Sequence, residues 1–110
     1  MRGACDCHVH IFGPPERFPL SRERKYTPPQ ASVAQLLALH DRLELERVVI
    51  VQASPYGTDN ACMLDALRQL GERARGVAVI DENTSLIPMH GLGCAVCAST
   101  CRPAASAIRR

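Results

Sequence analysis

Two histidines near the start of the chain, His8 and His10, are the residues best suited to chemistry. They lie two positions apart in a segment that reads as a strand, so both side chains should project from the same face. Two imidazoles that converge on one point suit a divalent metal ion, or a substrate oxygen that must be polarised. The plain alternative is a pair of polar residues at a strand end without chemistry, because His-x-His alone has little specificity.

The elements around this pair must therefore decide between the two interpretations. Residues 4–12 read as a buried strand that delivers the histidines at its C-terminal end. The residues between and beside them, Cys7, Val9 and Ile11, should face an apolar layer behind the strand. A proline-rich, basic loop follows over residues 14–29, and its prolines exclude a helix or a central strand. Loops of this length in compact domains are commonly functional or disordered.

The next two elements follow from hydrophobic spacing. Apolar residues recur at helical spacing from Val33 to Leu43, and Ser32 can cap the start of that helix. His40 lies on the same stripe and is interpreted as a packed helix residue rather than a ligand. Residues 47–54 form a continuous run rich in β-branched side chains, which is typical of a parallel strand buried on both faces.

A second helix and a third strand complete the regular part of the chain. Thr58 or Asp59 can cap the helix, and Gly71 lies near its end. Residues 76–81 then read as a short apolar strand. Strands that alternate with helices predict a parallel α/β fold.

Two parallel architectures compete, a doubly wound sheet and a (β/α)8 barrel. No glycine-rich phosphate loop follows the first strand, which disfavours a nucleotide-binding doubly wound sheet. Polar residues stand instead at the ends of successive strands: His8 and His10, then Ser54, then Asp81. Because barrels assemble their chemistry at that rim, the sequence predicts the beginning of a barrel.

Composition limits the possible partners and location. The chain has 110 residues, 46% of them hydrophobic, and a net charge of only +2, which gives no argument for nucleic-acid binding. No stretch approaches the roughly 20 apolar residues that a membrane span needs. The N-terminus lacks the apolar core of a secretory signal. We therefore expect a cytoplasmic protein whose six cysteines are reduced thiols.

Four ordered segments of the chain resemble the amidohydrolase superfamily, and more narrowly its amidohydrolase-related, lactonase-like branch. The resemblance runs from about residue 4 to about residue 90. The segments are Asp-Cys-His-Val-His-Ile-Phe-Gly at 6–13, Arg-Lys-Tyr-Thr-Pro-Pro at 24–29, Val-Gln-Ala-Ser at 51–54 and Gly-Thr-Asp-Asn at 57–60.

The resemblance implies roles for four residues. His8 and His10 would contact the carbonyl of a lactone, whereas in metal-dependent relatives the same pair binds zinc. Tyr26 and Ser54 would hold carboxylate or carbonyl oxygens of the substrate, and both hydroxyls can donate hydrogen bonds to an anion. The alternative interpretations are a loop anchor for Tyr26 and a turn or helix-capping serine for Ser54. Asp81 matches no role in the family.

The resemblance also implies an activity. The lactonase-like branch is thought to work without a metal, so no cofactor is expected, although zinc stays possible. The substrate would be a small anionic lactone such as 2-pyrone-4,6-dicarboxylate, formed in the breakdown of aromatic acids. A metal-dependent amidohydrolase or decarboxylase of the same superfamily is the alternative enzyme. The water-activating aspartate of the superfamily comes from the eighth strand, and a barrel takes ~250 residues. We therefore expect this chain, with about three βα units, to be inactive alone.

The last twenty residues differ from the rest. Residues 91–110 show no helical or strand periodicity, so we assign residues 1–90 to the partial barrel and 91–110 to an unstructured tail. Its cysteines, Cys94, Cys97 and Cys101, raise the rival hypothesis of a small metal-binding module, although their spacing matches no zinc or iron–sulfur motif well.

A shift of reading frame explains this tail better. With plausible codons for 91–101, one restored base in front of them yields Arg-Ala-Gly-Val-Arg-Gly-Val-Arg-Phe-Asn-Leu. A strand of the Gly-Val-Arg-Gly-Val-Arg-Phe-Asn type is expected at this point in the family. We therefore hypothesise a single-base deletion, real or a sequencing error, near codon 91.

Overall fold

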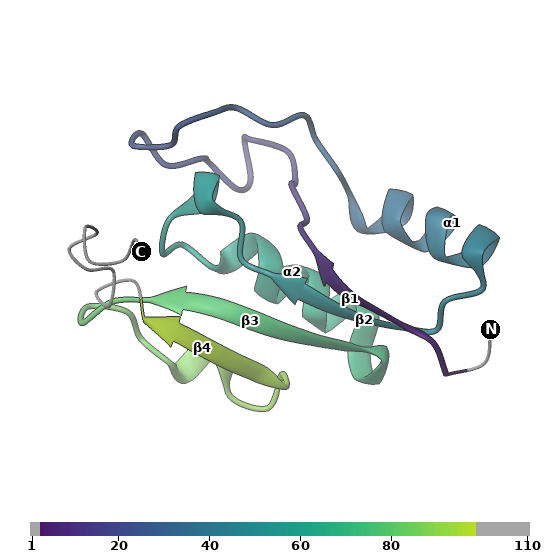
Figure 1. Ribbon diagram of the computed structural model, residues 1–110. Coiled ribbons are helices and arrows are strands. Elements are labelled where there is room, and N and C mark those ends of the chain that lie inside the picture. The colour runs from purple at the N-terminus through teal and green to yellow at the C-terminus, as the bar shows by residue number, and fades with distance from the viewer. Residues whose placement is uncertain (1–2, 99–110) are drawn as a thin grey trace, which may run out of the picture.

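Four parallel strands form one sheet in the order β1-β2-β3-β4 (Figure 1), in a computed structural model that describes residues 3–98. The strands are β1 (Cys5–Val9), β2 (Arg47–Val51), β3 (Ala74–Ile80) and β4 (Cys94–Ala98). Helix α1 (Val33–Leu43) joins β1 to β2, and α2 (Ala61–Leu70) joins β2 to β3. Short 3-10 turns lie at η1 (Ser54–Tyr56), η2 (Gly71–Arg73) and η3 (Ile87–Met89). The predicted parallel α/β class is confirmed.

Helix α1 begins as the sequence predicts. Ser32 Oγ accepts a hydrogen bond from the backbone N–H of Gln35 at 3.2 Å, and Gln35 Oε1 accepts one from the N–H of Ser32 at 2.7 Å. This reciprocal capping box satisfies two donors that the first turn would otherwise leave unpaired. The helix ends at Glu44, whose left-handed φ of 59° turns the chain toward β2.

Helix α2 begins later than predicted. Its N-cap is Asn60, not Thr58 or Asp59, although Asp59 Oδ1 accepts a hydrogen bond from the N–H of Ala61 at 3.1 Å. The side chain of Asn60 makes no capping bond because it is bonded to β3 instead. At the other end, Gly71 is the C-cap with φ of 65°, as the sequence predicts.

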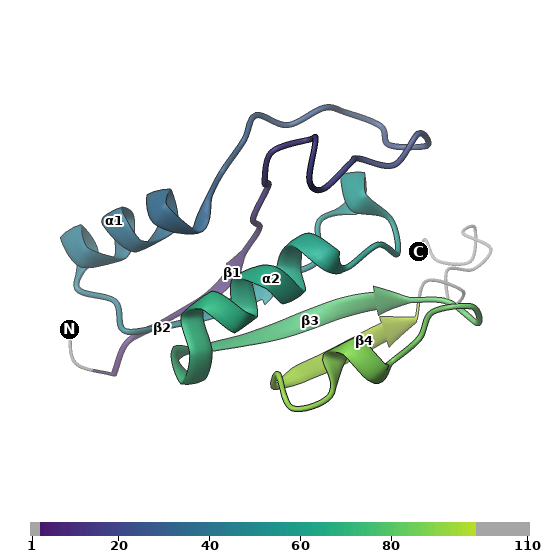
Figure 2. The same ribbon diagram turned by 180° about the vertical axis from the view of Figure 1, so that it is seen from behind.

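One face of the sheet carries the hydrophobic core. Figure 2 shows α2 lying across the strands, where it packs on β3 and β2. Alternate residues of the strands point toward it, and Ile50 of β2 and Ala78 of β3 are fully buried. The helix contributes its own apolar stripe to this core: Cys62, Met63, Leu64, Ala66, Leu67 and Leu70. We call this the covered face.

The opposite face is covered by no helix of the described chain (Figure 1). Val49 and Val51 of β2 and Val77 and Val79 of β3 are only half-buried there. We call this the open face. In residues 3–98 the outer edges of β1 and β4 pair with no further strand. Four parallel strands with one open face are half of the strand set that closes an eight-stranded barrel, in which the open face becomes the interior.

Strand β4 corrects the prediction for the tail. The sequence analysis treats residues 91–110 as unstructured, but residues 94–98 pair in parallel with β3 from Gly76↔Cys94 to Ile80↔Ala98. The pairing uses backbone groups on the free edge of β3, so it needs no hydrophobic periodicity in the added segment. Cys101 and the rest of 99–110 lie outside the described residues.

No helix within residues 3–98 is both long enough and apolar enough to cross a membrane.

Candidate active site

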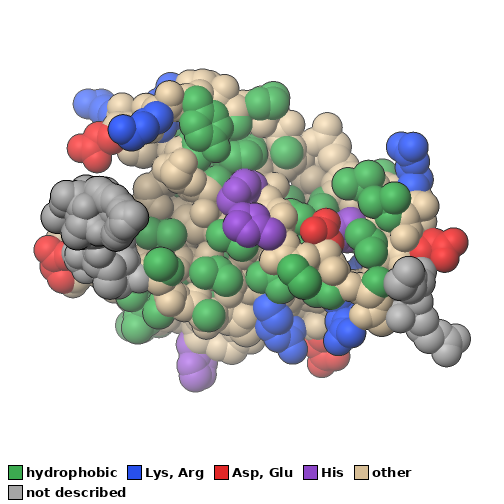
Figure 3. Space-filling view, in the orientation of Figure 1, with side chains coloured by type: hydrophobic (Ala, Val, Ile, Leu, Met, Phe, Trp, Pro, Cys, Tyr) green, Lys and Arg blue, Asp and Glu red, His purple; other side chains and the backbone are tan. Residues whose placement is uncertain are grey.

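The two histidines meet at the C-terminal end of β1. The ring centroids of His8 and His10 are 5.1 Å apart, and the rings stand edge to face at 86°. Both side chains are exposed, and Figure 3 shows a pair of histidines side by side among apolar residues. Both rings are therefore accessible to one small molecule above the open face.

A bulge in β1 produces this arrangement. Asp6 pairs with Val48 and Val9 with Ile50, so three residues of β1 advance over two of β2. Of the residues expected to face the apolar layer, Ile11 is buried and Val9 packs against the core. Cys7, however, is exposed. That part of the prediction is wrong, because strict alternation does not hold through a bulge.

A backbone contact fixes the ring of His10. Its Nδ1 lies 2.8 Å from the carbonyl oxygen of Val51, at the end of β2. A carbonyl only accepts hydrogen bonds, so Nδ1 carries the proton and donates it. In the neutral ring Nε2 is then left with a lone pair, able to bind a metal ion or accept a proton. In the imidazolium form, Nε2 becomes a donor that can polarise a carbonyl oxygen.

Ser54 lies in the first turn after β2 and lines an open groove of about 780 Å³. Asp81, which follows β3, lines the same groove, together with Ser21, Thr58 and Gln52. One oxygen of Asp81 is already engaged, because Oδ1 accepts hydrogen bonds from Thr84 Oγ1 at 2.9 Å and from the N–H of Asn83 at 3.0 Å. The structure thus brings Ser54 and Asp81 together at the rim.

Tyr26 lies neither with the His8–His10 pair nor among the residues that line the groove of Ser54. Its side chain is 51% exposed, and its hydroxyl has no hydrogen-bond partner among residues 3–98. The loop that carries it is nevertheless attached to the rim, since the N–H of Ser21 donates to the carbonyl of Pro55 at 2.7 Å. Within the loop, Arg24 Nε donates to Thr27 Oγ1 at 2.9 Å. The proposed substrate role of Tyr26 stays a prediction.

Tyr56 is a rim residue that the sequence analysis missed. Its hydroxyl accepts a hydrogen bond from the N–H of Gly13 at 3.0 Å, and its ring stacks on Phe12 at 5.7 Å. Burial, with the neighbouring Cys62 thiol, raises the pKa of Tyr56 to about 12. Tyr56 therefore joins the turn after β2 to the chain just beyond His10. The signal in the sequence that could have pointed to Tyr56 is an aromatic residue in the Pro-Tyr-Gly turn after β2.

The buried side-chain amides of Gln52 and Asn60 hold the same turn by hydrogen bonds to its backbone and to β3. Gln52 Nε2 donates to the carbonyls of Gly57 and Asp59, at 3.0 and 2.9 Å. Asn60 Nδ2 donates to the carbonyl of Val79 at 2.9 Å, and its Oδ1 accepts from the N–H of the same residue at 3.1 Å. These bonds tie the segment after β2 to itself and to β3. The Gln and Asn of the two motif segments thus have a structural role in this turn.

A zinc site is not complete in the described chain. Residues 3–98 contain no group of three or more His, Cys, Asp or Glu side chains that could hold a metal ion. His8 and His10 supply two ligands, fewer than zinc takes from a protein. On β4, Cys94 is half-buried against the core and Cys97 is exposed, as expected for residues an odd number apart in a strand. They do not converge, and Cys101 lies outside the described residues.

Comparison with known proteins gives one family. A family model described as amidohydrolase matches residues 5–87. The chain is 52% identical over 94 residues to a 2-pyrone-4,6-dicarboxylate hydrolase of Comamonas testosteroni, covering 83% of this chain and 31% of that protein. It is 41% identical over 76 residues to a 4-sulfomuconolactone hydrolase of Rhizobium radiobacter, covering 69% of this chain and 25% of that protein.

The fold agrees with a solved structure of the same kind. A crystal structure from Acinetobacter baumannii, described as a probable 2-pyrone-4,6-dicarboxylic acid hydrolase with citric acid bound, superposes with a TM-score of 0.75 at 28% identity. The match covers 87% of this chain and 36% of that one. The chain thus spans about a third of the length of the relatives that it matches.

Proposed function

This chain belongs to the amidohydrolase family, and we propose that it supplies the first part of the active site of a lactone hydrolase. The proposed substrate is a small anionic lactone such as 2-pyrone-4,6-dicarboxylate. The observation that carries the proposal is the His8–His10 pair, with rings 5.1 Å apart at the C-terminal end of β1. Two relatives, named as a 2-pyrone-4,6-dicarboxylate hydrolase and a 4-sulfomuconolactone hydrolase, support this substrate class.

The proposed chemistry is hydrolysis of a ring ester. Such a reaction needs a polarised carbonyl, an activated water and a proton for the leaving oxygen. In this proposal His8 and His10 contact the lactone carbonyl, and His10 polarises it from Nε2 while Nδ1 stays bonded to Val51. Ser54, in the groove that follows β2, and Tyr26, in the loop between β1 and α1, hold the remaining substrate oxygens.

The rest of the machinery belongs to parts of the barrel that these residues do not include. We propose that residues 1–90 alone do not turn over substrate, because the water-activating aspartate of the superfamily comes from the eighth strand. The proposal also places the protein in the cytoplasm, which agrees with the five described cysteines being free thiols.

A metal-dependent amidohydrolase is the second candidate, and the tautomer of His10 favours it. A ring that donates from Nδ1 to a backbone carbonyl and leaves Nε2 free is the arrangement typical of a metal ligand. His8 and His10 would then be two of the ligands, and the others would come from outside residues 3–98.

An assay of the full-length, frame-restored protein separates these candidates. We expect turnover of 2-pyrone-4,6-dicarboxylate that is unchanged by a chelator. His8→Ala and His10→Ala should each lower kcat/KM by about a hundredfold or more. His90→Ala is the matched control, since this exposed histidine precedes β4 and lies at the opposite edge of the sheet. Loss of activity with chelator would favour the metal enzyme, and no turnover would reject the lactonase assignment.

A further inference from the structure

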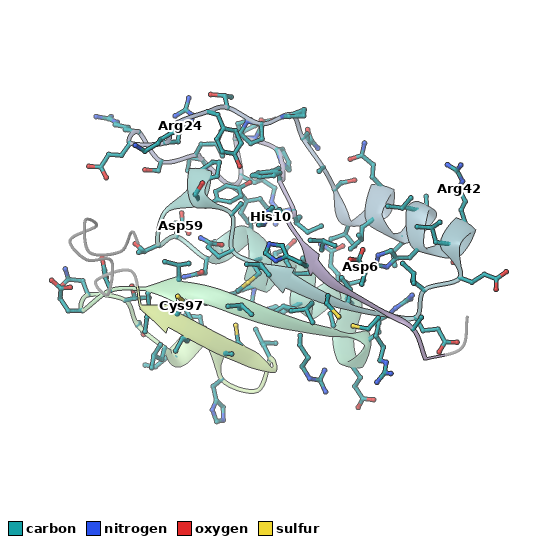
Figure 4. The ribbon with its side chains drawn as sticks, viewed as in Figure 1. Asp6, His10, Arg24, Arg42, Asp59 and Cys97 are labelled. Carbon is teal, nitrogen blue, oxygen red and sulfur yellow. The ribbon has the colours of Figure 1, made fainter. Side chains whose placement is uncertain are left out.

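A hydrogen-bonded pair of side chains, His40 and Asp6, joins α1 to the first half of β1. His40, in the last turn of α1, has its side chain only 2% exposed, and its Nε2 lies 3.0 Å from Oδ2 of Asp6 on β1. Figure 4 shows Asp6 on β1 next to α1, and His10 further along the same strand. The proposed reaction uses neither residue of this pair.

The direction of Asp6 is unexpected for its place in the strand. Asp6, His8 and His10 are each two residues apart, so a regular strand would point all three the same way. Instead the carboxylate of Asp6 meets a helix residue, while the rings of His8 and His10 are exposed together. The change occurs at the bulge between Asp6 and Val9, which shifts the register against β2.

The hydrogen bond between Asp6 and His40 stabilises the bulge of β1. A buried imidazole needs a partner for its N–H, and Asp6 is the partner that His40 has. Moving Asp6 back into regular alternation would leave the ring of His40 buried and unpaired.

We propose that Asp6 and His40 are positioning residues, which hold the bulge of β1 so that His8 and His10 face the substrate together. This inference rests on the proposed role of the two histidines. Neither Asp6 nor His40 touches substrate. They act through the backbone of β1, and the contact between the two exposed rings is the property that they control.

Two substitutions of His40 give the sharpest test in the isotope-labelled 110-residue chain. His40→Gln keeps an N–H donor close to the position of Nε2, whereas His40→Asn withdraws it toward the backbone, out of reach of Asp6. The measurement is the nuclear Overhauser effect between the rings of His8 and His10, together with the Nδ1–H signal of His10. We expect His40→Gln to keep both signals and His40→Asn to lose the contact between the rings.

Asp6→Ala should lose the same contact, and Asp65→Ala is its matched control. Asp65 has a side chain 30% exposed, against 28% for Asp6, but it pairs with Arg17 on the surface at 3.8 Å. A folded His40→Asn chain with the ring contact intact would overturn the proposal. An unfolded one would also overturn it, because the pair would then support the whole fold. Neither result depends on activity, so failure of the lactonase assignment would be seen separately.

Discussion

Strands β3 and β4 are paired alike but buried differently. They align over five residue pairs, from Gly76↔Cys94 to Ile80↔Ala98. In β3, alternate residues are buried beneath α2, whereas three consecutive residues of β4, from Ala95 to Cys97, are exposed. Backbone pairing therefore does most to keep β4 in the sheet, with Cys94 as its one side chain packed against the core, while β2 and β3 are held by pairing and by several buried side chains. The residues proposed for chemistry follow the strongly held strands and their neighbour β1.

Thiol reactivity should show the largest difference between these regions. Cys62 on α2 is buried and its Sγ lies 3.7 Å from the carbonyl of Ile11, and burial raises its pKa. Cys97 on β4 is exposed. Because alkylation needs an accessible thiolate, we expect Cys62 to react with iodoacetamide at least about a hundredfold more slowly than Cys97. Peptide mapping by mass spectrometry gives both rates, and equal rates would mean that the α2 core is open.

The next largest difference should be the loss of unfolding free energy when a valine is replaced by alanine in β2 and in β4. Val48 of β2 is 3% exposed and Val96 of β4 is 48% exposed. Val48→Ala leaves a gap beneath the core and should lower the free energy of unfolding by about 2 kcal/mol. Val96→Ala should change it by about 0.5 kcal/mol or less. Urea denaturation measures both. Similar losses would show that β4 is packed as firmly as β2.

The contribution of Tyr56, in the turn after β2, to stability can be tested by varying the pH. Burial raises the pKa of Tyr56 to about 12 from its ordinary value of 10.0, so the folded state holds this proton more tightly than the unfolded state. The resulting stability is present below pH 10 and is lost as pH rises through 12. From the size of the shift, the loss of stability is about 3 kcal/mol once the pH is well above 12.

Tyr56→Phe removes this titration, so its stability should fall less than that of the natural chain between pH 10 and 12. The same variant should already be weaker at pH 8, because the N–H of Gly13 loses its acceptor. Tyr26→Phe is the control, since that ring is 51% exposed. If Tyr56→Phe followed the natural chain through this range, Tyr56 would not be the group that titrates.

The same contrast separates what the sequence could predict from what it could not. Local patterns predicted β2, the helix cap at Ser32 and the helix end at Gly71, since each depends on neighbours within a few residues. The bulge of β1 is a shift of register against β2, and the bond from Gly13 reaches Tyr56; each joins residues more than thirty positions apart, which periodicity does not report. Strand β4 was missed because a free strand edge, not its own sequence, places it.

The proposed shift of reading frame would change the residues that form β4. Strand β4 occupies residues 94–98, where the restored frame would give Val-Arg-Gly-Val-Arg. Resequencing of the gene tests the proposal, and an ordinary reading frame through codon 110 without barrel sequence in the shifted frame would reject it. If the frame is restored, the strand would keep its position and change only its side chains.

The smallest predicted effect follows from that substitution of side chains. In the restored frame residue 97 is valine, a β-branched residue that favours strands. Because Cys97 is exposed and pairs opposite Val79, Cys97→Val should raise the free energy of unfolding by about 0.5 kcal/mol, and Cys97→Ala should not. Urea denaturation of the two variants measures the difference. A loss of stability with valine would mean that residues 94–98 are not a strand suited to the sequence of the restored frame.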